Sequence, residues 1–473
     1  MGSSKLSLAV VLFLATLVLA WVFHGTGVVR NDLERRIYIP DPLTMPLQVK
    51  AAYNGEKMFF RYRWPAERAY IYHDVLRYEG GKWVRIGDST TGPQPEGIYE
   101  DRVTMLVDDG RVPEFGAYGG YATIGDNMRF FTNQASKEEV QAHPYLGKKK
   151  GKTDVRKFLP ATRSDPADWA SVVSEEELAA LHAAGYFLDF WHWRAHRSNP
   201  VGKSDDQFVS DFRYGDKGQG IYTTNWDKEN NRPKWMFDPE KTGFRAWKWE
   251  DLEQRKLGFD DAYFMTEADA VAFDPDHSWQ DGDTLPRRAL RPGSGSHADI
   301  SVTGNARWQD GYWDVTLERA MDTGNRDDDK AFEPKRVYWA GFAVHRNASG
   351  SRWHYVSLPA TVGLERDADL RAVRFDGDVP GWEQPWFDVT LFYPGQVGWP
   401  LLTSHAHAGA EKIAQGVPAA ARHTPEQLAH YGVEIEFNES IITHWLWTVI
   451  AGVVLIIGFG FALSGAMRSK TGE

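Results

Sequence analysis

Apolar and polar residues alternate along several short stretches of the chain, which is the pattern of half-buried β-strands. Two such stretches, LQVKAAY and MFFRYRW, lie on either side of Asn54-Gly55, and two more, VLRYE and KWVRI, flank Gly80-Gly81. Asn-Gly and Gly-Gly pairs favour tight turns because these residues adopt positive φ at little cost. The pattern therefore predicts two β-hairpins near the start of the chain.

Further strands are expected over residues 100–107, 312–319 (after an Asp310-Gly311 turn) and 387–393, with two more around 347–350. Short strands at this spacing predict a mainly β fold, an immunoglobulin-like or carbohydrate-binding-module-like β-sandwich with a few short helices. One helix is expected over 174–184, where Ser174 and Glu177 have the spacing of a capping box. The stretches 114–131 and 215–250 show no such period, so we interpret them as a loop and an extended surface excursion.

The segment DFWHWRAHR, residues 189–197, combines aromatic and cationic residues in a strand-like alternation. In an extended chain, Trp191 and Trp193 face one side of the sheet, and His192 and Arg194 face the other. Two indoles favour burial, and an imidazole beside a guanidinium group offers a metal ligand next to a fixed cation. This combination suits a cofactor that carries a metal and carboxylates. The alternative is a core strand whose polar residues point to solvent.

Two apolar runs near the chain ends, residues 6–23 and 441–463, predict one N-terminal and one C-terminal transmembrane helix. The first run lacks a small-x-small cleavage site, so we interpret it as an uncleaved signal anchor. Arg468 and Lys470 lie in the 464–473 tail, and the positive-inside rule places that tail in the cytoplasm. The domain between the helices, residues 40–440, is then expected to be periplasmic, attached to a bacterial inner membrane.

The composition limits which metals, cofactors and partners the chain could bind. The 473 residues include no cysteine, which excludes disulfides, thiolate metal sites, iron–sulfur clusters and thioether-linked haem. A metal would therefore need His, Met, Lys or carboxylate ligands, and His405 with His407 forms one candidate pair. The net charge of −11, with both signs mixed along the chain, argues against a nucleic-acid partner.

Two acidic runs, at residues 205–206 and 327–329, lack the alternating ligands of a calcium loop, so we interpret them as solvated turns. The chain shows no nucleophile–base signature that would indicate an independent enzyme.

Four motifs occur in an order that resembles a known family: EDRVTMLVDDG, DFWHWRAHRSNPVG followed by DDQF, ARWQDGYWDVTLERA, and FAVHRNASGSRWHYVS. Over roughly residues 47–357 the chain resembles the ethylbenzene dehydrogenase-related haem-binding domain, which is similar to the haem-carrying subunit of type II dimethyl sulfoxide reductase-like enzymes. The resemblance implies a sandwich related to DOMON and carbohydrate-binding modules. It also implies one b-type haem between a Met and a Lys or His, in a subunit that passes electrons and transforms no substrate itself.

Matched to that family, Met105 occupies the position of the Met ligand. Some relatives carry Lys where this chain has Arg194, and a guanidinium group stays protonated and is a poor ligand. His192 is therefore the expected second axial ligand, with His196 and Lys203 as the next candidates. Arg194 would then pair with a haem propionate.

Relatives with covalently bound haem carry a C-x-x-x-C-H type attachment in the loop after the Met strand. Gly120, Ile124 and Gly125 stand at the matching positions here, so the resemblance implies a non-covalent haem b or none. Met128 in the same loop becomes a spare candidate ligand.

The expected function is that of a membrane-anchored b-type cytochrome, with Trp191 and Trp193 lining an apolar haem pocket. It would carry electrons between a redox partner, a cytochrome or a molybdenum oxidoreductase, and the respiratory chain. The alternative is a haem-free, membrane-tethered module whose aromatic residues bind a carbohydrate or a protein partner.

Overall fold

The computed structural model describes residues 44–87, 98–123, 135–155, 157–166, 168–304, 306–347, 354–393 and 438–470, with a few single positions before 19 and between 409 and 412. The chain divides into two units. One unit, Asp32–Tyr431, holds the β-strands, and the other consists of the two chain ends, Met1–Asn31 and Gly432–Glu473.

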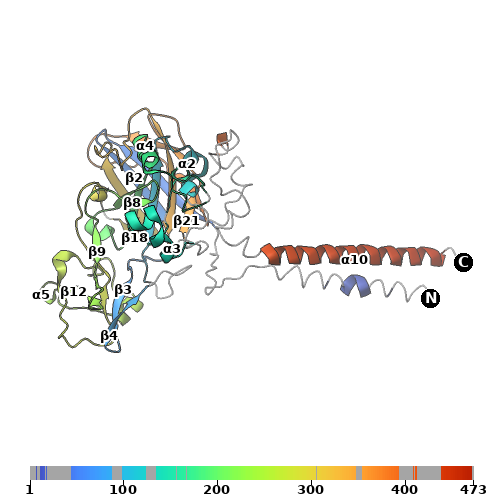
Figure 1. Ribbon diagram of the computed structural model, residues 1–473, viewed down its shortest axis with the longest axis horizontal. Helices are drawn as coiled ribbons and strands as arrows, with labels where there is room; N and C mark the ends of the chain where they lie inside the picture. Colours follow the sequence, from blue (N-terminus) through green and yellow to red (C-terminus); the bar gives the residue numbers. More distant parts are fainter. Residues whose placement is uncertain are drawn as a thin grey trace. The chain divides into compact units, whose positions relative to one another are not determined.

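Fourteen strands form one large, mostly antiparallel sheet (Figure 1). They are β1 (Thr44–Tyr53), β2 (Lys57–Pro65), β5 (Arg102–Asp108), β6 (Leu188–Arg194), β7 (Asp205–Val209), β8 (Arg213–Gly215), β17 (Ser301–Val302), β18 (Arg307–Gln309), β19 (Tyr312–Ala320), β20 (Val337–His345), β21 (His354–Ser357), β22 (Ala360–Leu364), β23 (Leu370–Arg374) and β24 (Phe387–Phe392). The main order is β17-β19-β2-β1-β23-β22-β20-β5-β6-β7-β8, while β18, β21 and β24 pair beside this path. Strands β5 and β20, far apart in the sequence, are therefore direct neighbours.

The predicted hairpins are confirmed. Strands β1 and β2 pair around Asn54-Gly55, where the Asn54 side chain accepts hydrogen bonds from two backbone amides of the turn. Strands β18 and β19 join through Asp310-Gly311, and both turn residues have positive φ, as a tight two-residue hairpin requires. Strand β3 (Val75–Glu79) likewise turns into β4 (Lys82–Ile86) through Gly80-Gly81.

The large sheet folds back on itself and encloses the core. Strands β2 and β6 are not hydrogen-bonded neighbours, yet their aromatic side chains meet. The ring centroids of Phe60 and Trp191 lie 5.5 Å apart, and those of Trp64 and Trp193 lie 6.1 Å apart. All four side chains are buried, so the two halves of the sheet face each other. This confirms a mainly β fold, while its assignment to an immunoglobulin-like or carbohydrate-binding-module-like class stays a prediction.

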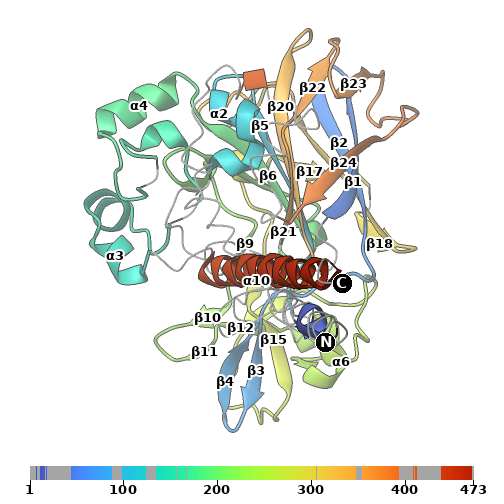
Figure 2. The same cartoon turned by 90° about the vertical axis from the view of Figure 1, so that its right-hand side faces the viewer.

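A smaller lobe packs beside the large sheet. It contains a four-stranded sheet in the order β13-β15-β3-β4 and three two-stranded pairs. Its remaining strands are β9 (Tyr222–Thr224), β10 (Trp226–Asp227), β11 (Arg232–Pro233), β12 (Trp235–Phe237), β13 (Trp247–Lys248), β14 (Ala270–Ala272), β15 (Asp283–Pro286) and β16 (Arg288–Leu290). The interpretation of 215–250 as a surface excursion is wrong, because Phe237 and Trp247 are buried in the core. Figure 2 shows this lobe below the large sheet.

Short helices cover parts of the sheet. Helix α4 (Glu175–Ala183) confirms the predicted helix, and the Ser174 hydroxyl accepts a hydrogen bond from the Glu177 amide at its N-terminus. The loop expected from residue 114 instead begins with helix α2 (Pro113–Tyr118) and the 3-10 helix η1 (Gly119–Thr123), because Pro113 occupies a first-turn position that favours helix. The others are α3 (Lys137–Ala142), η2 (Pro144–Lys149), η3 (Pro160–Thr162), η4 (Asn199–Val201), α5 (Pro239–Thr242), α6 (Trp249–Glu253), η5 (Glu267–Asp269) and η6 (Ser296–Ala298).

The C-terminal helix α10 (Asn438–Lys470) contains one apolar span, Ile442–Gly465, that is long enough to cross a membrane. Its large side chains are exposed, as a lipid-facing helix requires. The expected N-terminal span over 6–23 falls mostly outside the described residues, and the structure does not support it; the described positions there are helical. His405 and His407 also lie outside the described residues.

Two buried carboxylates just before β5 connect it to the turn after β6 and to the opposite half of the sheet. Glu100 accepts hydrogen bonds from the amides of His196 and Arg197, both at 2.9 Å, and from Arg197 Nε at 2.6 Å. Asp101 accepts one from Trp313 Nε1 at 2.8 Å. Burial is the largest single influence on Glu100 and opposes its ionisation, but the nearby positive charges, led by Arg197, together outweigh it and hold the pKa of this carboxyl well below its usual range.

Replacing Glu100 by Gln should therefore destabilise the fold strongly. The change leaves the Arg197 guanidinium buried beside a neutral amide, and breaking a buried ion pair from one side costs about 3–5 kcal/mol. Thermal unfolding of the full chain in detergent should show a clearly lower melting temperature for Glu100→Gln. Glu56→Gln, at an exposed position, should melt like the unaltered protein, and equal melting of both variants would contradict this role.

Candidate functional site

Strand β6 is buried on both faces along its whole length, and its side chains alternate as predicted. Trp191 and Trp193 point into the core between the two halves of the sheet. His192 and Arg194 point to the opposite, outer face. The segment is a core strand, as the alternative held, but neither polar side chain reaches solvent, so the alternative is wrong on that point.

Met105 lies on the core face and not with His192. The register pairs Met105 with Trp191 and Thr104 with His192, and paired residues project to the same side of a sheet. In the core, the Tyr62 hydroxyl hydrogen-bonds the Met105 sulfur at 3.3 Å. The predicted pairing of Met105 with His192 on one iron is therefore corrected, because the two side chains leave the sheet on opposite faces.

Two further histidines join His192 on the outer face. His345, at the end of β20, and His354, at the start of β21, are cross-strand partners. The ring centroids of His192 and His345 are 6.4 Å apart, and those of His345 and His354 are 4.8 Å apart. The sequence reasoning missed both residues, although they flank the turn of a hairpin that it predicted.

Arginines surround these imidazoles. The Arg194 guanidinium forms an ion pair with Asp205 and places Nη2 2.9 Å from His192 Nδ1. Arg102, on β5 between the two histidine strands, pairs in register with both Arg194 and His345. We call this group, His192, Arg194, His345, His354 and Arg102, the histidine–arginine face.

The electrostatics of this face keep the His192 and His345 imidazoles neutral. Burial lowers the pKa of His192 well below its usual value, and the Arg194 and Arg102 charges lower it further. Burial also lowers the pKa of His345, with His354 and Arg102 as the next causes. Neutral imidazole is the form that binds a metal.

His192 has an unused ring nitrogen. Nε2 is buried and has no hydrogen-bond partner among the described residues. Nδ1 lies near Arg194 Nη2, which can only donate, and 3.3 Å from Gln207 Oε1, which accepts. A neutral ring has one N–H, so if Nδ1 donates to Gln207, Nε2 keeps a free lone pair for a metal.

The other predicted ligands lie in different surroundings. His196 donates its backbone amide to Glu100, and its Nδ1 contacts the carbonyl oxygen of Ile71 at 2.8 Å. The ammonium group of Lys203 donates to the Ser301 hydroxyl at 3.2 Å. Neither has a recorded contact with the histidine–arginine face, and Met128 lies outside the described residues.

This face fits a planar cofactor with a metal and carboxylates better than a bare ion. Within the described residues its imidazoles do not form a compact set of three ligands for one small ion. The ring centroids of His192 and His345 lie 6.4 Å apart and the ring planes differ by 21°, so these two imidazoles would be the pair to hold one metal. Buried guanidinium groups are the side chains that best pair with carboxylates such as propionates.

Comparison with known proteins adds one match. Residues 24–357 match the model of the family described as ethylbenzene dehydrogenase. The matched range includes β5, β6, β20 and β21, and therefore the whole histidine–arginine face. No curated protein matches the chain.

The Arg194–Asp205 ion pair should be essential to this face. Asp205→Asn leaves a buried guanidinium without its carboxylate, which we expect to lower the free energy of unfolding by about 3 kcal/mol. Thermal unfolding of the full chain measures the loss. Asp376→Asn, at an exposed position, provides the control, and an Asp205→Asn variant as stable as that control would show that Arg194 has another counter-charge.

Proposed function

This chain belongs to the ethylbenzene dehydrogenase family, and on that premise we propose that it is a membrane-anchored subunit that binds one non-covalent haem b and passes electrons. Its partner would be an oxidoreductase of the molybdenum type or a cytochrome. The observation that supports the proposal most directly is the histidine–arginine face, where neutral imidazoles and buried guanidinium groups share one side of β5, β6 and β20.

His192 and His345 would hold the haem iron. They come from the two strands that flank β5 and leave the sheet on the same face as Thr104 and Arg102. His354 stacks on His345 with an interplanar angle of 13° and would hold that ring in place. Met105 keeps its core position and takes no part.

The arginines would position the cofactor through its propionates. Arg194 Nη2 donates a hydrogen bond to His192 Nδ1. This bond favours the tautomer that carries its proton on Nε2, and in that form Nε2 cannot bind a metal. A carboxylate near Arg194 would draw the guanidinium away from Nδ1 and leave Gln207 as its acceptor. Propionate binding and iron ligation would then reinforce each other through one side chain.

A haem held by two imidazoles supplies one-electron transfer and has no open coordination position for a substrate. The chain would contribute a dry environment and nearby positive charges. Burial of β5 and β6 on both faces excludes water, and the surrounding cations favour the reduced, less positive state. Helix α10 would tether the domain to the membrane, with the basic end near Arg468 in the cytoplasm and the β domain in the periplasm.

The first test is the absorption spectrum of the full chain, purified in detergent from haem-producing cells, before and after dithionite. We expect the sharp reduced α-band of a low-spin b-type cytochrome. His192→Ala and His345→Ala should each remove or broaden that band, because each leaves the iron with one strong ligand.

Met105→Leu is the matched control. It conserves the volume of a core side chain and should cost less than about 1.5 kcal/mol while leaving the band unchanged. A folded protein with no band, even after hemin is added, would overturn the proposal and favour the haem-free binding module. A band that survives both histidine changes but is lost in Met105→Leu would overturn the ligand assignment.

A further inference from the structure

A second group of charged side chains lies where β6, β7 and β19 meet. Arg319 is fully buried and bonds three carboxylates: Asp189 at 2.5 Å, Asp206 at 2.6 Å and Asp329 at 2.7 Å. The interpretation of Asp206 and of the 327–329 run as solvated turns is therefore wrong for the buried positions. Asp327 alone is exposed, and it pairs with Lys217.

The carboxylates of this group outnumber its cations. Asp216, after β8, and Asp328 approach Asp329, and one oxygen from each of the three lies within 4.8 Å of the others. All three are at least nine-tenths buried, with exposed fractions of 4%, 2% and 3%. The adjacent Lys330 does not balance them, because its ammonium group bonds Asp109 and the carbonyl oxygen of Gly185.

Several of these oxygens lack a partner. Both carboxylate oxygens of Asp216 and Oδ1 of Asp328 are buried without a hydrogen bond from any described residue. An ionised carboxylate in such a place costs several kcal/mol unless a cation compensates it.

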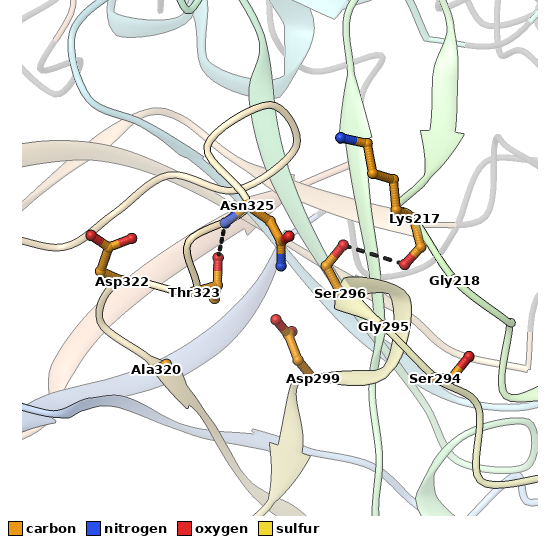
Figure 3. Close-up of a pocket in the computed structure, with 10 residues that line it drawn as sticks. All are labelled: Lys217, Gly218, Ser294, Gly295, Ser296, Asp299, Ala320, Asp322, Thr323 and Asn325. Atoms are coloured by element: carbon orange, nitrogen blue, oxygen red, sulfur yellow. Dashed lines mark hydrogen bonds between the residues drawn. The ribbon is translucent and has the colours of Figure 1, made fainter.

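The surrounding loops hold these oxygens together beside an open pocket. The Ser296 hydroxyl donates to Asp328 Oδ2 at 3.1 Å, and the Thr323 hydroxyl donates to Asp329 Oδ2 at 2.5 Å. Figure 3 shows the pocket, into which Asn325 projects from the loop between β19 and β20, and Ser296 and Asp299 project from the η6 segment. Ser296 and Thr323 line this pocket and also bond Asp328 and Asp329, so the pocket lies next to the carboxylates.

We propose that Asp216, Asp328 and Asp329 bind a calcium ion that links the segment after β8 to the loop between β19 and β20. The ligands are hard carboxylate oxygens, with no histidine or cysteine among them, which favours Ca²⁺ or Mg²⁺ over transition metals. Calcium accepts six to eight oxygens in irregular geometry, whereas Mg²⁺ requires near-ideal octahedral geometry. Three carboxylates supplied by two separate loops match the calcium requirement.

The test measures binding of Ca²⁺ alone to the full chain in detergent, after treatment with EDTA and dialysis. Isothermal titration calorimetry should show one site, and the melting temperature should rise with Ca²⁺ concentration because the ion binds only the folded state. Mg²⁺ should raise it less. Asp328→Asn and Asp216→Asn should each weaken Ca²⁺ binding by at least about 10- to 100-fold, the loss that even outer-shell changes cause.

Asp327→Asn is the matched control, because it changes an adjacent but exposed aspartate and should bind Ca²⁺ like the unaltered chain. Asp216→Asn should also fold without Ca²⁺ at least as well as the parent, since a neutral amide replaces a carboxyl that lacks partners. Asp216→Asn therefore tests the calcium site even if Asp328→Asn fails to fold. No binding heat together with the same melting temperature in EDTA and in Ca²⁺ would overturn the proposal, as would equal losses in Asp327→Asn and Asp216→Asn.

Discussion

Burial of strand β6 on both faces is the constraint on which the rest of the structure depends. A strand in the middle of a sheet places its side chains alternately on two sides, so the side chains on each side need their own packing or polar partners. On the core side, Trp191 and Trp193 pack against aromatic residues of β2. On the outer side, His192 and Arg194 are polar and still buried, and hydrogen bonds and ion pairs must replace the water they lose.

The same alternation separates two charged groups. Asp205 and Asp206 are neighbours on β7, yet Asp205 pairs with Arg194 on the outer face and Asp206 pairs with Arg319 on the core side. On the outer face Arg102 also lies 3.6 Å from Glu100, whereas the group around Arg319 carries more carboxylates than its guanidinium balances. In our account the outer group binds a haem and the second group binds a calcium ion. The two sites lie on different faces, and His297 lies between them: its Nε2 is 3.5 Å from Asp205 Oδ1, and its Nδ1 is 3.3 Å from the Asp216 carbonyl oxygen.

Local patterns predicted the parts of this fold that depend on neighbouring residues. Asp310-Gly311 fixed a hairpin, and the two-residue period of 191–194 fixed which side chains share a face. Local patterns could not predict which distant strands pair or in what register. Met105 was paired with His192 through the family resemblance, but only the register of β5 against β6 shows that they face apart. His345 joined the site because β20 pairs with β5, a contact across more than 200 residues. Asp328 and Asp329 were interpreted as a solvated turn because no neighbouring residue in the sequence indicates that Arg319 lies beside them.

Near-infrared magnetic circular dichroism of the oxidised full chain tests the central claim most directly, because its charge-transfer band depends on both axial ligands of a low-spin haem. The account predicts the band of two imidazole ligands, unchanged in Met105→Leu and lost in His345→Ala. A band of imidazole–thioether ligation would contradict it and would require Met105 or another methionine at the iron.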